Sequence, residues 1–225
     1  MRSGGIRLAF GLALAAFASL AQPAVAQDRR QNTPGAFDFY VLALSWSPSF
    51  CEASGERAPR QQCGERPYSF VVHGLWPQYA RGFPEFCQVP APRVDRNSVT
   101  SMLDLMPAPR LVYNEWDKHG TCAGLSARAY FETIRKARAV VKIPEQYLEP
   151  QTLLRVSPDE VEEAFVAANK GLPRDAIAVQ CDRTRLREVR ICMGRDFSFH
   201  SCPEIDRRSC RRDRLSMPPV RGGAR

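Results

Sequence analysis

Two short segments of this chain carry side chains suited to moving protons. The first, residues 73–77, reads His-Gly-Leu-Trp-Pro, and the second, residues 115–122, reads Glu-Trp-Asp-Lys-His-Gly-Thr-Cys. Each contributes one histidine, and an imidazole can accept or donate a proton near neutral pH. The chain has only three histidines, so the placement of two of them in such segments indicates an acid–base pair.

Cleavage of RNA through its own 2′-hydroxyl would use this set of groups. A base removes the 2′ proton, the oxygen attacks the neighbouring phosphorus, and an acid protonates the departing 5′ oxygen. Negative charge builds on the phosphoryl oxygens, where the cation of Lys118 would lower the barrier. Glu115 could orient a neighbour, or hydrogen-bond the phosphoryl group if its pKa were raised.

Each of these residues also has a purely structural interpretation. His73 alone is better explained as a hydrogen-bonded histidine that closes a strand, and Trp76 as a buried core residue. Glu115 and Lys118, three apart on a helix, could form a surface ion pair worth roughly 0.2–0.5 kcal/mol. His119 could end a helix, where a cation is favoured. Composition and spacing alone do not decide between these interpretations.

Residues 1–26 have the pattern of a secretory signal peptide. Arg2 and Arg7 precede an apolar run over 8–21, and Ala-Val-Ala at 24–26 matches a small-x-small cleavage site. The apolar run is too short to span a membrane. We therefore expect an exported protein, periplasmic or extracellular, with a single folded domain after the signal.

The chain has eight cysteines and none of them forms a C-x-x-C pair. An even number in an exported chain favours four disulfides, whereas a zinc site of cysteine and histidine would need paired ligand spacings. The residues by themselves leave the pairing open.

The order of predicted elements indicates an α+β domain. Segments rich in β-branched and aromatic residues predict strands at 37–46, 68–72, 176–181 and 189–193, with His73 at the end of the second and a loop over 51–67. Helical spacing and N-cap residues predict helices from Ser98 to about Met106, over 111–119, over 127–142 and after Ser157.

The segment after Cys210 is strongly basic. It has five arginines against one aspartate, a net charge of +4. Its proline and glycine content predicts a poorly ordered tail over 211–225. Such a tail could be a solvated end of the chain or could bind anions such as RNA phosphates.

The two motifs together resemble the active-site segments of the ribonuclease T2 family. Residues 39–46 are similar to the opening strand of that family, and the order of the last six cysteines fits its framework. The resemblance covers residues 37–210. It implies a domain over 27–210 with a central antiparallel β-sheet, packed helices and four disulfides: Cys51–Cys63, Cys87–Cys122, Cys181–Cys210 and Cys192–Cys202.

The resemblance also implies roles for the motif residues. His119 would be the general base on the 2′-hydroxyl and His73 the general acid for the 5′ oxygen. Lys118 and Glu115 would stabilise the transition state, and Trp76 would stack on a base. The implied enzyme is a monomer that cleaves single-stranded RNA without metal, cofactor or membrane, giving a 2′,3′-cyclic phosphate and then a 3′-phosphate.

Two positions depart from the family pattern. Asn114 stands where many eukaryotic members have a histidine that helps to hold phosphate; it can donate a hydrogen bond but carries no charge. Gln78 replaces an aspartate near the base pocket, so base preference cannot be transferred. His200 matches no catalytic position, and we interpret it as structural.

Two other functions fit parts of the sequence. An exported, disulfide-stapled RNA-binding module without turnover would use the fold and the basic tail, although the four expected catalytic residues argue against it. A metal-dependent nuclease would need a carboxylate-rich site, which neither motif offers.

Overall fold

The structure, a computed structural model, describes residues 31–64 and 66–220. The expected signal peptide over 1–26 lies outside the described residues. Within them, none of the helices has the length and hydropathy needed to cross a membrane.

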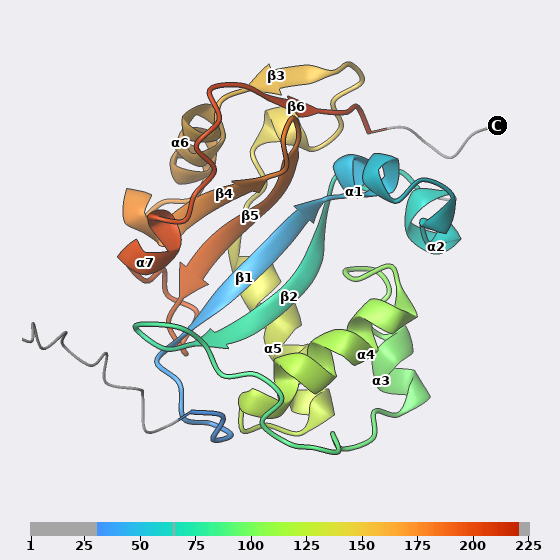
Figure 1. Cartoon of the computed structure of the whole chain (residues 1–225), viewed down its shortest axis with the longest axis vertical. Helices are drawn as coiled ribbons and strands as arrows, with labels where there is room; N and C mark the ends of the chain where they lie inside the picture. The colour runs from blue at the N-terminus through green and yellow to red at the C-terminus, as the bar shows by residue number, and fades with distance from the viewer. Residues whose placement is uncertain (1–30, 65, 221–225) are drawn as a thin grey trace, which may run out of the picture.

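A four-stranded antiparallel sheet forms the centre of the molecule (Figure 1). Its strand order is β2-β1-β5-β4, and the strands are β1 Phe39–Trp46, β2 Phe70–Gln78, β4 Ile177–Cys181 and β5 Leu186–Met193. A second, two-stranded sheet pairs β3 Leu154–Val156 with β6 Leu215–Met217. The α+β fold with a central antiparallel sheet is therefore confirmed.

Helices pack around the central sheet. In the described part of the chain they are α1 Ser47–Ser54, α2 Arg60–Cys63, α3 Arg96–Thr100, α4 Pro109–Lys118, α5 Ala127–Val140, α6 Pro158–Ala168 and α7 Pro203–Asp206. Figure 1 shows α5 crossing behind β1 and β2. The core continues to α6, whose Phe165 ring lies 5.6 Å from Phe70 of β2, and Phe70 in turn contacts Trp46 of β1.

Capping residues set the start of two helices as the sequence predicts. The Ser126 side chain accepts a hydrogen bond from the Ala129 N–H at the start of α5. Ser157 and Glu160 form a complete capping box at the start of α6. These bonds satisfy N–H groups that have no partner within a helix.

Two local predictions are wrong. The segment over 51–67 is not a plain loop, because α1, with Pro48 in its first turn, runs on to Ser54 and α2 follows. Proline suits that turn since its missing N–H would be unpaired there anyway. Helix α3 is capped by Asp95 instead of Ser98; the Asp95 carboxylate accepts from the Ser98 N–H and hydroxyl, and the helix ends at Thr100.

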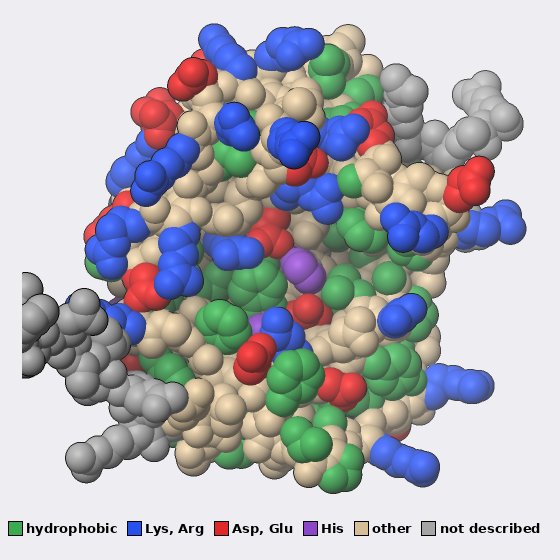
Figure 2. All heavy atoms as spheres, in the orientation of Figure 1, with side chains coloured by type: hydrophobic (Ala, Val, Ile, Leu, Met, Phe, Trp, Pro, Cys, Tyr) green, Lys and Arg blue, Asp and Glu red, His purple; other side chains and the backbone are tan. Residues whose placement is uncertain are grey.

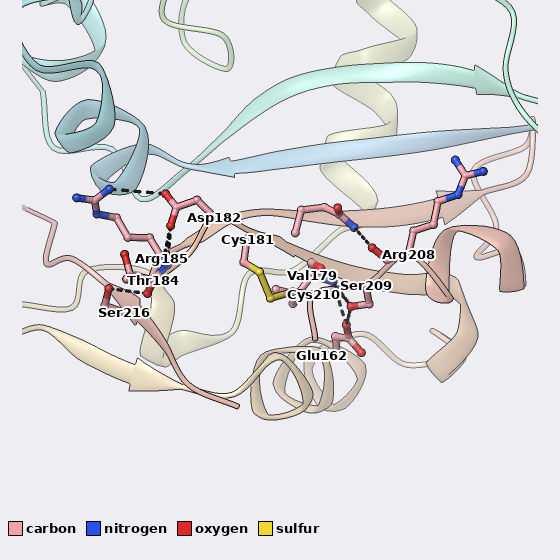
Figure 3. Close-up of a disulfide and its surroundings, with 11 residues drawn as sticks. Glu162, Val179, Cys181, Asp182, Thr184, Arg185, Arg208, Ser209, Cys210 and Ser216 are labelled. Carbon is pink, nitrogen blue, oxygen red and sulfur yellow. Dashed lines mark hydrogen bonds and ion pairs between the residues drawn. A yellow bond between two sulfur atoms is a disulfide. The ribbon is translucent and has the colours of Figure 1, made fainter. Parts of the chain in front are cut away.

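All four expected disulfides are present: Cys51–Cys63, Cys87–Cys122, Cys181–Cys210 and Cys192–Cys202. The third joins the end of β4 to the C-terminal segment (Figure 3). Beside it, the Ser209 hydroxyl donates to the buried carboxylate of Glu162 on α6, which also accepts from the backbone N–H of Val179 on β4. Through these contacts, α6 and the segment around Ser209 cover β4, the edge strand of the central sheet.

The prediction of a poorly ordered tail is wrong for the described residues after Cys210. Leu215, Met217 and Val220 are buried, and β6 pairs with β3. The backbone carbonyl of Pro218 accepts a hydrogen bond from the Trp46 indole at 3.1 Å. Arginine dominates the composition of this segment. The buried side chains of Leu215, Met217 and Val220 determine its structure, because they complete the hydrophobic core.

Met217→Ala should therefore lower the free energy of unfolding by about 2–5 kcal/mol, since it empties a fully buried site. Ser216→Ala, in the same strand, removes only a partly exposed hydroxyl that donates to the Thr184 carbonyl and should cost about 0.5–1.5 kcal/mol. Denaturant unfolding of both variants measures the difference. Equal small losses would contradict the account of β6 as part of the core.

Candidate active site

A β-bulge places His73 in the middle of β2. Along the β1–β2 pair, Ala43 lies opposite Gly74 and Leu44 lies opposite Val72, so His73 has no partner on β1. Such an extra residue bends the strand and redirects its side chain. The expectation that His73 ends a strand is wrong: β2 runs on to Gln78, and as an edge strand it can contain proline at position 77.

Helix α4 delivers the second motif to the same place. Glu115 lies in its last turns and His119 follows at its C-cap; both are buried, at 6% exposure each. Four residues apart, the two side chains lie on the same, buried side of this segment. Lys118 points to the rim, where its Nζ lies 3.5 Å from the Glu85 carboxylate, so the proposed surface pair of Glu115 with Lys118 does not form.

Glu115 connects the two motifs. Its Oε2 accepts a 2.7 Å hydrogen bond from the Trp76 indole, and its Oε1 lies 3.5 Å from Nε2 of His73. A side-chain carbon at Gly74 would collide with the Glu115 carboxylate and the Trp76 indole, so only glycine allows this approach. Trp76 is only partly buried: it packs against the core and also contacts Glu115.

Neighbouring elements hold α4 against β2. The Tyr130 hydroxyl of α5 donates to the Leu75 carbonyl at 2.8 Å. The Cys87–Cys122 disulfide ties the loop after β2 to the turn that follows His119. The backbone N–H of Phe86 donates to the Lys118 carbonyl. These links fix the distance between the two histidine segments.

His119 lies in an apolar environment. Its ring centroid is 5.2 Å from that of Trp76 and 6.2 Å from that of Phe83. Among the described residues its Nδ1 has no hydrogen-bond partner. Burial, together with the positive charges of Lys118 and His73, lowers the pKa of His119 to about 3. His119 is thus neutral, and able to accept a proton, over most of the pH range.

His73 has the opposite electrostatic environment. Burial alone would lower its pKa, but the hydrogen bond to Glu188 and the negative charge of Glu115 more than offset this, so the pKa of His73 is raised above 6.5. Burial also raises the pKa of Glu115 above its usual value. Between the two histidine pKa values, one imidazole carries a proton and the other does not.

Sequence reasoning missed Glu188 and Arg190 on β5. Oε2 of Glu188 lies 2.8 Å from Nδ1 of His73, and its Oε1 accepts from Arg190 Nε at 2.6 Å. The predicted strands at 176–181 and 189–193 leave Glu188 in the turn between them, whereas β5 begins at Leu186. The sequence does contain a signal for this part of the strand. Polar Glu188 and Arg190 alternate with apolar residues at 189 and 191, as in a strand with one polar face.

The remaining candidates lie at or outside the margin of this cluster. Asn114 is exposed on α4. Gln78 is buried and donates to the Pro77 carbonyl, and His200 is exposed with its ring 4.9 Å from that of Phe39. In the described part of the chain, no group of three or more His, Cys, Asp or Glu side chains is arranged to hold a metal ion.

A pocket of about 230 Å³ opens beside His73. Its walls include Phe50, Leu111, Arg187 and Glu188. Figure 2 shows a histidine at the surface in the middle of the face seen in Figure 1, with hydrophobic, acidic and basic side chains around it. A histidine is therefore accessible on this face, and a pocket adjoins His73.

Gly74→Ala should destabilise the protein by about 1–3 kcal/mol, because the new methyl group forces the Glu115 carboxylate and the Trp76 ring apart. In the Glu115→Ala background the same change should cost less, by about 0.5–3 kcal/mol. Urea unfolding of the two single variants and the double variant gives this coupling energy. Strictly additive costs would contradict the contact at Gly74.

Comparisons with known proteins identify the family of this chain. Residues 37–202 match the model of the ribonuclease T2 family. A ribonuclease of Aeromonas hydrophila is 36% identical over 177 residues, which cover 72% of this chain and 74% of that protein. A probable ribonuclease of Haemophilus influenzae is 35% identical over 157 residues, which cover 63% of this chain and 58% of the relative.

Solved structures share the fold. RNase NT, crystallised in complex with 5′-AMP, superposes with a TM-score of 0.66 at 23% identity, covering 81% of this chain and 98% of that one. An RNase-related protein from Calystegia sepium gives the same TM-score at 22% identity. The matched family model spans both histidine motifs and the four strands of the central sheet, and the chain therefore belongs to the ribonuclease T2 family.

Proposed function

We propose that this chain is a metal-independent endoribonuclease that cleaves single-stranded RNA through the 2′-hydroxyl. One observation carries the proposal: two imidazoles with oppositely shifted pKa values flank the same Glu115–Trp76 pair. A transphosphorylation needs one group that accepts a proton and one that donates it at the same pH. The products would be a 2′,3′-cyclic phosphate and then a 3′-phosphate.

In this mechanism His119 takes the 2′ proton and His73 protonates the departing 5′ oxygen. The lowered pKa of His119 keeps it neutral, and the raised pKa of His73 keeps it charged up to a higher pH than an ordinary histidine. The reverse assignment would require each group in its less populated state. This supports His119 as the base and His73 as the acid.

Glu115 and Lys118 would stabilise the transition state. The raised pKa of Glu115 favours a protonated share that can donate to a phosphoryl oxygen. Lys118 is half-exposed at the rim, and its contact with Glu85 is a 3.5 Å surface pair of little strength. Its ammonium group can therefore exchange that contact for a phosphate.

The flanking surfaces would take the bases. Trp76 presents a partly exposed ring beside both histidines, and stacking on such a ring gives affinity with little base preference. The pocket beside His73 would take the base on the other side of the scissile bond. Exposed Asn114 would lie outside these contacts and interact with the RNA backbone.

The setting of this activity would be an oxidising compartment outside the cytoplasm. Four disulfides in the described part of the chain and the signal pattern of residues 1–26 support export of the protein.

Substitution of either catalytic histidine tests the proposed function. His73→Ala and His119→Ala should each lower kcat on single-stranded RNA by about 10²–10⁴-fold, with folding preserved. His200→Ala is the matched control, since His200 is exposed and outside the site, and it should keep wild-type activity. All assays run with and without excess EDTA, which should change nothing. Loss of activity with EDTA, or near-normal turnover by either active-site variant, would refute the proposal.

The pH dependence follows from the two histidine shifts. His119 must be neutral, so kcat/KM should fall only as the pH drops toward its pKa of about 3. His73 must be protonated, so kcat/KM should fall as the pH rises through a value above 6.5. A pH profile from 3 to 9 with a dinucleotide measures the basic limb and shows whether an acidic limb lies above the lower end of this range. An acidic limb centred near 6.5 would show that His119 titrates as an ordinary histidine.

A further inference from the structure

Glu188 is a buried carboxylate that lies outside both motifs. It is 6% exposed on β5, yet each of its oxygens meets a nitrogen: Nδ1 of His73 at 2.8 Å and Nε of Arg190 at 2.6 Å. Burial of a carboxylate is costly unless charged or strongly polar partners compensate it. The two partners here include the group proposed as the general acid.

We propose that Glu188 is a positioning residue that holds His73 as an imidazolium with its Nε2–H facing the Glu115–Trp76 pair. This inference rests on the proposed function. The bond at Nδ1 fixes the plane of the ring and leaves Nε2 as the only nitrogen that can give a proton to substrate. Nε2 already lies on that side, 3.5 Å from Oε1 of Glu115.

The charges around His73 single out Glu188 from the other carboxylate. Burial alone would raise the pKa of Glu188, but the hydrogen bond from His73 and the Arg190 guanidinium lower it, so Glu188 stays ionised. Glu115 on α4 has a pKa raised by burial and loses its charge first as the pH falls. Glu188 therefore remains negatively charged beside His73 at a low pH at which Glu115 has lost its charge.

The other titratable groups near His73 are two arginines and the neutral His119. Arg190 lowers the pKa of His73 by its charge, and Arg187 lines the adjoining pocket; neither guanidinium can accept the Nδ1–H of a protonated His73. His119 lies beyond Trp76. Glu188 is thus the one strong acceptor for that proton among the described residues around the ring.

Arg190 in turn fixes Glu188. The two residues lie on the same side of β5, two positions apart, and the Nε bond occupies the oxygen that His73 does not use. The Arg190 guanidinium also lies over the Trp76 ring, 5.0 Å from its centroid. Arg190, which itself contacts the Trp76 ring, therefore holds the Glu188 carboxylate in place. The carboxylate cannot turn away from His73 without breaking its hydrogen bond to Arg190.

Glu188→Gln tests the role, since it keeps the shape and an acceptor oxygen but removes the charge. NMR titration of the three histidines in the full chain should show the pKa of His73 falling by about 1–3 units, with His119 and His200 unchanged. The basic limb of kcat/KM should move down by the same amount and the acidic limb should stay. At a pH below the lowered pKa of His73, activity should approach that of the wild type. Glu188→Asp, which keeps the charge, should shift the limb less.

Glu162→Gln is the matched control. Glu162 is 4% exposed, accepts from a backbone N–H and a hydroxyl, and pairs with Arg174, but lies away from the site on α6. Its loss should lower Tm without moving the basic limb or the His73 titration. If Glu188→Gln lowers activity equally at every pH and leaves the His73 pKa unchanged, Glu188 is structural only and the inference fails. If the wild type does not cleave RNA, the proposed function fails, while the NMR titration still decides the role of Glu188.

Discussion

The approach of the Glu115 carboxylate to the backbone at Gly74 is the constraint on which the rest of the site depends. It joins two sequence segments some forty positions apart, and it is possible only because position 74 has no side chain. The surrounding structure keeps α4 and β2 at that distance, through the Tyr130 hydrogen bond to the strand and the Cys87–Cys122 disulfide. A bulge in β2 then turns His73 toward the same carboxylate.

Within this arrangement, burial lowers the pKa of both histidines, but their charged neighbours act in opposite directions. His119 is buried among aromatic rings with positive charges nearby, so its charged form is disfavoured. His73 loses solvent as well, but it gains a carboxylate on each nitrogen. Both imidazole rings lie against Trp76. The difference in their protonation therefore comes from the charged groups near each ring. One small cluster thereby provides an acid and a base at the same pH.

The sequence predicted what local patterns determine. Alternating or periodic apolar residues located the four strands of the central sheet and most helices, and Ser126 and Ser157 marked two helix starts. It did not predict what depends on tertiary contacts. The bulge at His73 arises from the pairing of β2 with β1. Strand β6 forms because its apolar residues are buried in the core. Glu188 was assigned to a turn by its charged neighbours, since nothing in a single strand shows that a histidine on β2 will meet it.

In the proposed mechanism, the 2′-hydroxyl of the RNA attacks the phosphorus while it lies between His73 and His119. Phosphorus-31 NMR of a dinucleoside monophosphate during turnover, compared with its 2′-deoxy analogue, tests this mechanism. We expect a 2′,3′-cyclic phosphate resonance that appears before any 3′-phosphate, and no reaction of the deoxy analogue. Release of a 5′-phosphate, or cleavage of the deoxy analogue, would contradict it.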